Sequence, residues 1–165
     1  MDISEAIFSR RTIKDFKPDR VPDEILEHAL TAGQWAQNHR MTEPWRFIVL
    51  GPETHRLLAA TEQKLMTKPR IIGVACRLNG DIRQQREDYA AVCCAIQNIQ
   101  LAAWAEGVGM QWSTGRVVQL PQTSELLNVD TAHEELVGLL YFGYPATTPA
   151  PPARKPLAEV MQRLP

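Results

Sequence analysis

The residues from Ser9 to Phe16 concentrate positive charge and a hydroxyl group near the start of the chain. Arg10, Arg11 and Lys14 lie close together, with Thr12 between them. A guanidinium presents a planar fork of donors that matches the oxygens of a phosphate, and a hydroxyl adds one more donor. Most arginine pairs are solvated surface charges. The stretch by itself therefore leaves two interpretations open, a grip for an anion and an ordinary charged surface.

The composition indicates one domain spanning residues 1–165, which is long enough to enclose a hydrophobic core. Its 44% hydrophobic and 22% charged residues are typical of a globular protein and argue against disorder. A formal net charge of −1 argues against nucleic acid as a partner, because such domains are usually basic. No apolar run has the length of a membrane span, and the first residues lack a signal-peptide layout. We therefore expect a cytoplasmic protein that does not bind membranes.

The cysteines and histidines do not form a metal-binding pattern. Cys76, Cys93 and Cys94 are odd in number and include no Cys-x-x-Cys pair, and the histidines show no His-Glu-x-x-His spacing. We predict no metal site and interpret Cys93 and Cys94 as small core residues. The glycine-rich motifs of the common nucleotide-binding folds are also missing from the sequence.

Hydrophobic periodicity predicts helices and strands in mixed order. The expected helices cover residues 2–9, 21–33, 53–66, 86–106, 121–127 and 157–164. The expected strands cover residues 44–50, 71–76 and 135–144, with a shorter strand-like piece inside 110–115. A polar loop is expected over 77–85, and a proline-rich extended tail begins at about residue 145.

Three further stretches could position a ligand. Residues 86–106 are apolar or small on most sides, which predicts a helix in the core or in a subunit interface. The turn from Trp112 to Gly115 exposes backbone N–H groups and could approach a flat ligand, although a plain turn has the same composition. His39 lies in a polar loop before a predicted strand, where it could contact a ligand or be bonded locally.

Four motifs in this order resemble the nitroreductase family of flavin enzymes, over almost the whole chain. Trp112–Gly115 also resembles the Trp-x-x-Gly of the family's short branch. The four motifs are Arg10-Arg11-Thr12-x-Lys14-x-Phe16, Glu43-Pro44-Trp45-Arg46-Phe47, the helix from Gln97 to Ala103 with its exit Gly107-Val108-Gly109, and Gly138–Gly143 followed by Arg154-Lys155-Pro156-Leu157.

The resemblance implies an α+β fold of three layers, with a central mixed or antiparallel sheet flanked by helices. It also implies an intertwined homodimer that binds FMN at the subunit interface. By position, Arg10 and Arg154 would hold the FMN phosphate and Thr12 would add a hydroxyl. Arg11 would contact the ribityl chain or the pyrimidine edge, and Lys155 is a weaker phosphate candidate. His39 would reach the flavin of the partner subunit, and the flavin ring would be lined by Trp112, Ser113, Thr114 and Gly115.

Several positions depart from the family pattern. Thr12 replaces a serine and keeps the hydroxyl, whereas Lys14 replaces an arginine and loses its fork of donors. Met41 stands where many members have an asparagine that contacts the pyrimidine, and Glu43 replaces a glutamine. The connection over residues 66–71 is too short for the helical lid of longer members. We therefore expect an open and less selective pocket.

The activity implied is that of an NAD(P)H-dependent FMN oxidoreductase. Hydride would pass from NADH or NADPH through flavin N5 to a small nitroaromatic, quinone, enone or aldehyde, with no side chain acting as general acid or base. The alternatives are a flavin enzyme of another activity, such as dehalogenation or flavin fragmentation, and a non-catalytic protein that binds flavin or a partner. A structural domain with solvated arginines is the remaining possibility.

Overall fold

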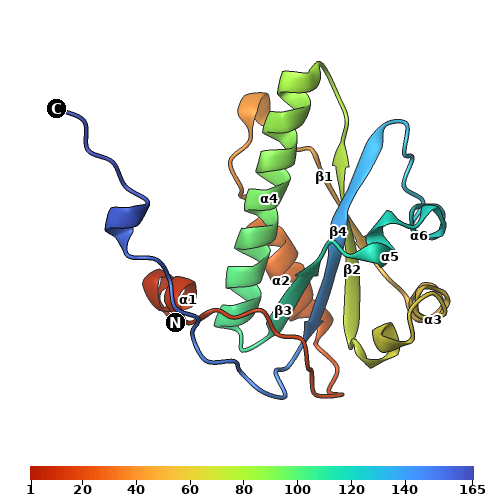
Figure 1. Ribbon diagram of the computed structural model, residues 1–165. Helices are drawn as coiled ribbons and strands as arrows, with labels where there is room; N and C mark the ends of the chain where they lie inside the picture. Colours follow the sequence, from red (N-terminus) through yellow and green to blue (C-terminus); the bar gives the residue numbers. More distant parts are fainter.

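The computed structural model describes residues 1–165 and contains one four-stranded sheet between two layers of helices (Figure 1). The strands follow the order β1-β2-β4-β3, and every neighbouring pair is antiparallel. The α+β class and the central sheet predicted from the sequence are confirmed, and the sheet is antiparallel throughout. The strands are β1 Trp45–Val49, β2 Arg70–Arg77, β3 Gly109–Ser113 and β4 Glu134–Gly143.

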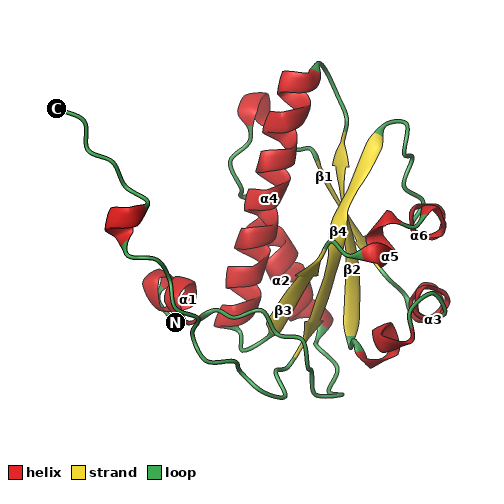
Figure 2. Cartoon of the chain, viewed as in Figure 1, coloured by secondary structure: helices red, strands yellow, loops and turns green.

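The helices divide between the two faces of the sheet, as Figure 2 shows in red. One face carries α2 and α4, and the other carries α3, α5 and α6. Each face has its own core, one centred on residues such as Ile72 and Ile99 and the other on Leu58 and Tyr141. The bounds are α1 Ile3–Ser9, α2 Asp23–Gln34, α3 Pro52–Ala59, α4 Ile82–Ala105, α5 Arg116–Gln119 and α6 Pro121–Leu126.

The longest helix begins earlier than the sequence predicted. Residues 82–85 belong to α4, because the side chain of Asp81 accepts hydrogen bonds from the backbone N–H groups of Arg83 and Gln84 and caps the first turn. The helix then packs closely on α2. A Cβ added to Gly33 would lie only 2.7 Å from Ile99 Cγ1, so this glycine permits the close approach and does not end the helix, which continues to Gln34.

The single helix predicted over 53–66 is wrong. Helix α3 ends at Ala59, and a 3₁₀ turn at Gln63–Thr67 follows. The Thr61 hydroxyl donates to the Leu58 carbonyl at 2.7 Å, a local bond that competes with helix continuation. Leu58 and Leu65 are buried, whereas Leu57 and Met66 are exposed.

The structure adds two features that were not predicted and corrects one more prediction. Strand β1 lies at the edge of the sheet, and of its residues only Trp45 is buried. Helix α5 was not predicted. The helix expected over 157–164 is reduced to a 3₁₀ turn at Leu157–Glu159, because every residue from 146 to 165 is exposed and no partner element stabilises it. Figure 1 shows the end of this tail extending away from the rest of the molecule. None of the helices combines the length and apolar character of a membrane span.

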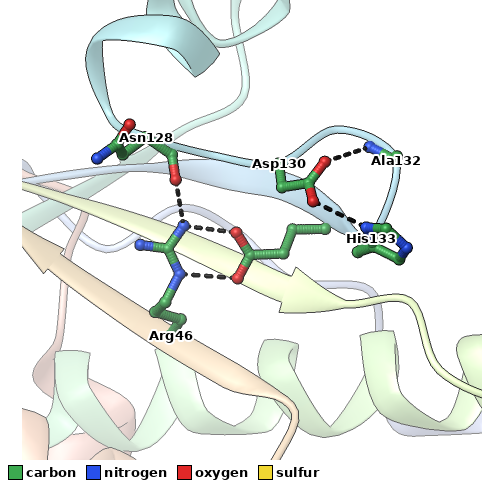
Figure 3. A network of polar contacts seen from close by, with 6 residues as sticks. Arg46, Asn128, Asp130, Ala132 and His133 are labelled. Carbon is green, nitrogen blue, oxygen red and sulfur yellow. Dashed lines mark hydrogen bonds and ion pairs between the residues drawn. The ribbon is translucent and has the colours of Figure 1, made fainter.

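An ion pair joins the edge strand β1 to β4 across β2 (Figure 3). Arg46 Nε donates to Glu134 Oε1 at 2.7 Å, and Arg46 Nη2 donates to the Asn128 carbonyl at 2.9 Å. The Glu134 side chain is 12% exposed and that of Arg46 is 33% exposed. The hydrogen bond from Arg46, followed by its charge, lowers the pKa of Glu134.

We predict that Glu134→Gln lowers the free energy of unfolding by about 1–2 kcal/mol at pH 7, because Arg46 loses a charged acceptor while staying partly hydrated. The folded pKa of Glu134 is depressed, so the pair contributes stability above its ordinary value of 4.5 and loses it as the pH falls further. The difference from wild type should therefore shrink toward pH 3 in urea unfolding curves.

The matched control is Glu53→Gln, which removes an exposed ion pair with Arg56 on α3. We expect no measurable change from it. A Glu134→Gln effect of the same size at pH 7 and pH 3 would contradict the assignment.

Candidate functional site

The segment from Arg10 to Lys17 lies along β3 and the end of β4. Ile13 N–H donates to the Met110 carbonyl at 3.1 Å, Thr12 and Met110 form a parallel bridge, and Lys17 N–H donates to the Tyr144 carbonyl at 2.8 Å. Ile13 is fully buried, and a Cβ on Gly109 would lie 2.5 Å from its Cγ1. The buried side chain of Ile13 thus holds the segment against β3, while Thr12 and Lys14 on either side of it are exposed.

Two arginines of this segment lie close to an arginine of the tail. Burial, then the charge of Arg11, then that of Arg154 lower the pKa of Arg10. None of the three forms an ion pair. The three guanidiniums repel one another, and no carboxylate is paired with them. A bound anion would offset this repulsion, so the group is a candidate anion site. Arg10 and Arg154, from opposite ends of the chain, are therefore close enough for their charges to interact, and their predicted role in holding a phosphate stays a prediction.

Arg11 also has a structural task at the end of α1. Its Nη1 donates to the carbonyls of Phe8 and Arg10 at 2.9 and 2.7 Å, so the guanidinium satisfies carbonyls that the helix leaves free. Its Nε is buried and has no partner in the chain. A buried donor of this kind is normally paired, and a bound polar ligand would pair it. The predicted contact of Arg11 with a ribityl chain stays a prediction.

The other end of the site is formed by the end of β3. Trp112 Nε1 donates to the Val137 carbonyl at 3.4 Å, and a Cβ on Gly138 would lie 2.4 Å from that nitrogen, so the indole lies directly over Gly138. Ser113 is half-buried, and Thr114 and Gly115 are exposed. A cavity of about 270 Å³ opens beside this turn, lined by Ser113, Gly115, Arg116, Val117, Glu62 and Lys64.

Two lysines near the site were missed by the sequence analysis. Lys64 pairs with Glu62 beside the cavity. Lys68 is buried and donates from Nζ to the Lys14 carbonyl at 2.6 Å. Lys64 lies in the stretch that was predicted as a helix, and Lys68 lies just after it, before β2. Their only sequence signal is the presence of two lysines on either side of the buried Leu65, just before a strand.

His39 is far from the arginines within one chain. It lines a cavity with Asp81 and Glu87 at the first turns of α4. At the other end of that helix, Trp104 Nε1 donates to Ser9 Oγ at 2.9 Å. A rise of 1.5 Å per residue separates Glu87 from Trp104 by about 25 Å. A role for His39 in the same site therefore requires a second subunit, and its predicted contact with the partner's flavin stays a prediction.

The loop that carries His39 is strained and is held in place by a buried carboxylate. Arg40, Met41 and Glu43 have positive φ angles of 57°, 54° and 44°, which are costly for residues with side chains. Thr42 Oγ1 donates to Asp88 Oδ1 at 2.7 Å. Asp88 is fully buried in α4, and Gln84 Nε2 donates to the same oxygen at 3.0 Å. The long helix therefore fixes the conformation of this loop.

The chain belongs to the Nitroreductase family, whose sequence model matches residues 7–75 and 74–144. Membership confirms the family inferred from the four motifs and makes the protein a nitroreductase-type oxidoreductase. A Bacillus subtilis protein provisionally named NAD(P)H nitroreductase YfhC is 30% identical over 178 aligned residues, which cover 95% of this chain and 91% of that protein.

Solved structures agree with the fold. The Nitroreductase-like Family Protein from Bacillus cereus superposes with a TM-score of 0.90 at 29% identity, covering 99% of this chain and 96% of that one. A Desulfovibrio desulfuricans protein, provisionally described as a nitroreductase and solved in complex with FMN, gives a TM-score of 0.85 at 28% identity. That match covers 100% of this chain and 98% of the other. The nitroreductase-like fold expected from the sequence is confirmed.

Proposed function

We propose that this protein binds FMN and uses it to transfer reducing equivalents from NADH or NADPH to a small oxidised acceptor. The observation that carries the proposal is the group of three guanidiniums at Arg10, Arg11 and Arg154, none of which forms an ion pair with a carboxylate. The FMN complex of the Desulfovibrio desulfuricans relative supports the same ligand. Arg10 and Arg154 would bind the phosphate, with Thr12 adding a hydroxyl and Lys155 a second charge nearby.

The order of the residues along the start of the chain and β3 supports an elongated ligand with one anionic end and one flat end. Thr12 and Met110 form a parallel bridge at the start of β3, so Arg10 precedes this point in its segment and Trp112 follows it in β3. A strand rises about 3.3 Å per residue. The distance from the arginines to the end of β3 is therefore roughly the length of an extended chain of several carbons. Trp112, Ser113, Thr114 and Gly115 would therefore line the ring, and Lys64 would add positive charge beside the turn.

The chemistry would belong to the cofactor. Bound FMN would accept a hydride at N5 and reduce a nitroaromatic, quinone, enone or aldehyde. The residues of the chain would bind and orient the cofactor, and no side chain is assigned as general acid or base. Burial raises the pKa of Cys76 to about 12, and burial also raises that of Cys93, so neither thiol supplies a thiolate near neutral pH.

The exposed apolar surface supports a homodimer. Phe8 on α1 is 78% exposed, and Trp35 after α2 is 83% exposed. A cavity of about 570 Å³ lies between α1, α2 and α4 and is lined mostly by apolar residues. An apolar surface of this kind marks an interaction site. A second copy placed here would let the tails intertwine and would bring His39 of one subunit toward the arginines of the other.

We predict that Arg10→Ala and Arg154→Ala each weaken FMN binding about tenfold to a hundredfold, because each removes charge-assisted hydrogen bonds of about 1.5–3 kcal/mol. The measurement is quenching of FMN fluorescence during titration with apoprotein. Arg56→Ala, on an exposed face of α3, is the control and should leave Kd unchanged. Unchanged Kd in both site variants would refute the phosphate assignment, and a wild-type protein that cannot be reconstituted with FMN would refute the cofactor.

We further predict that NADH or NADPH bleaches the absorbance of the bound flavin and that an acceptor restores it. Stopped-flow mixing with each nicotinamide, followed by a panel of nitroaromatics, quinones, enones and aldehydes, measures both steps. Bleaching without reoxidation by any of these acceptors would favour another flavin chemistry, such as dehalogenation. Failure of both nicotinamides to bleach the flavin would favour a non-catalytic flavin-binding protein.

We predict that the protein sediments as a dimer and that Trp35→Glu shifts it toward the monomer, because a carboxylate would be buried in the apolar interface. Analytical ultracentrifugation over a range of concentrations measures the equilibrium. Leu57→Glu changes an exposed leucine on α3, on the other side of the sheet, and should leave the dimer intact. A wild-type protein that remains monomeric at micromolar concentration would contradict the interface.

A further inference from the structure

The loop of residues 38–43, between α2 and β1, is anchored to α4 through one buried carboxyl group. Thr42 Oγ1 donates to Asp88 Oδ1 at 2.7 Å, and Gln84 Nε2 donates to the same oxygen at 3.0 Å. Asp88 is fully buried, and its other oxygen, Oδ2, is buried without a partner in the chain. An unpaired buried oxygen costs free energy that an apolar side chain would not. Packing alone therefore does not account for a carboxyl group at this position.

The anchored loop has a conformation that its own residues disfavour. Arg40, Met41 and Glu43 all have positive φ angles, and such strain persists only where the surrounding structure maintains it. Within the loop, Asn38 Oδ1 accepts from the Glu43 N–H at 2.9 Å, and Thr42 supplies the side-chain bond to the core. Arg40, Met41 and Glu43 are exposed, so the strain does not serve to bury them. The loop is therefore held in a fixed shape at the surface, where strained residues commonly contact a ligand.

The loop borders the surface that is proposed above to form the dimer. The exposed Trp35 lies just before the loop, at the end of α2. A cavity of about 420 Å³ is lined by loop residues, among them His39, and by α4, and the larger apolar cavity described above lies further along the same helix. Both cavities are lined by one face of α4, whose residues recur at intervals of three or four: Glu87, Ala90, Cys94, Asn98, Leu101 and Ala105. This face runs from the loop, at the start of α4, to the end that lies against Ser9 and the arginines.

The loop and the arginines lie at opposite ends of α4, so the loop of one chain does not reach the arginines of the same chain. Two copies packed through this face of α4 in antiparallel directions would place the loop of each copy at the arginine end of the other. The dimer proposed above would then contain two FMN sites, each built from the arginines of one subunit and the loop of the other.

We propose that Thr42 and Asp88 are positioning residues for the FMN site of the opposite subunit. They hold the loop in the strained conformation in which it contacts the cofactor, and they act through the loop without touching FMN themselves. The proposal rests on the FMN binding and the dimer proposed above. Without the bond from Thr42, the loop would occupy its competent conformation for only a fraction of the time. The apparent dissociation constant of FMN then rises by the reciprocal of that fraction.

The first experiment compares Thr42→Val, which keeps the side-chain shape and removes the donor, with Thr42→Ser, which keeps the donor. Quenching of FMN fluorescence measures Kd, and urea unfolding of each apoprotein shows that it is folded. We expect Kd to rise about tenfold in Thr42→Val, for a competent fraction of about one tenth, and Thr42→Ser to restore most of the wild-type affinity. An unchanged Kd in Thr42→Val would overturn the proposal. If Thr42→Val does not fold, Thr42→Ala, which puts no methyl group beside the Asp88 oxygen, carries the same test.

A mixed dimer tests whether the loop acts on the opposite subunit. One subunit carries Arg10→Ala, the other carries Thr42→Val, and two different affinity tags isolate the mixed species. If the loop acts across the interface, both substitutions fall on one FMN site, and half of the sites bind FMN with the wild-type Kd. If the loop acts within its own subunit, or if Thr42→Val merely damages the subunit that carries it, no site keeps the wild-type Kd and the proposal fails.

Failure of the proposed function gives a different result. A wild-type protein that binds no FMN overturns both that function and this inference. A wild-type monomer that binds FMN overturns the dimer and the action of the loop across it. A wild-type dimer that binds FMN, with an equal Kd in Thr42→Val, overturns the positioning role alone.

Discussion

Ile13 packs into the space that Gly109 leaves free at the start of β3, and the positions of Arg10 and Thr12 depend on this contact. With the hydrogen bond from Ile13 to Met110, it turns the chain after α1 into an extended segment beside the sheet. Side chains on either side of Ile13 must then face solvent. This is how a short charged stretch becomes a surface that presents Thr12 and Lys14 at a defined distance from the end of β3.

The two ends of α4 carry different parts of the proposed site. Its last turns lie against Ser9, next to the arginines, while its first turns fix the strained loop of His39 through Asp88. A helix of this length cannot bring its own two ends together. Two copies of the chain packed side by side could place the first end of one helix near the second end of the other. The apolar surface on α1 and α2 gives such packing a driving force.

Local patterns in the sequence predicted more of the fold than of the site. The order of motifs identified the family, and periodicity located most of the helices and strands, because core-facing residues repeat with the geometry of each element. The prediction over 53–66 failed because the Thr61 hydroxyl competes for a helix carbonyl. The loop predicted over 77–85 is shorter in the structure, because Asp81 caps α4 and residues 82–85 form its first turn. The buried position of Lys68 could not have been found from sequence, since the rings of Phe16 and Tyr141 that flank its ammonium reach it only in the tertiary fold.

The tail places Arg154 near Arg10 although no residue after 145 is buried. Prolines recur from Pro145 to Pro156, and proline-rich chains are extended and stiff, so this stretch acts as a short spacer. A stiff spacer of matching length keeps Arg154 at a high effective concentration near Arg10. Little conformational entropy of the tail is then lost when a ligand binds. The second arginine of the proposed phosphate site is thus carried by an extended tail and not by a helix or strand of the folded core. Its strength as a ligand is governed by the length and stiffness of the spacer as much as by the guanidinium.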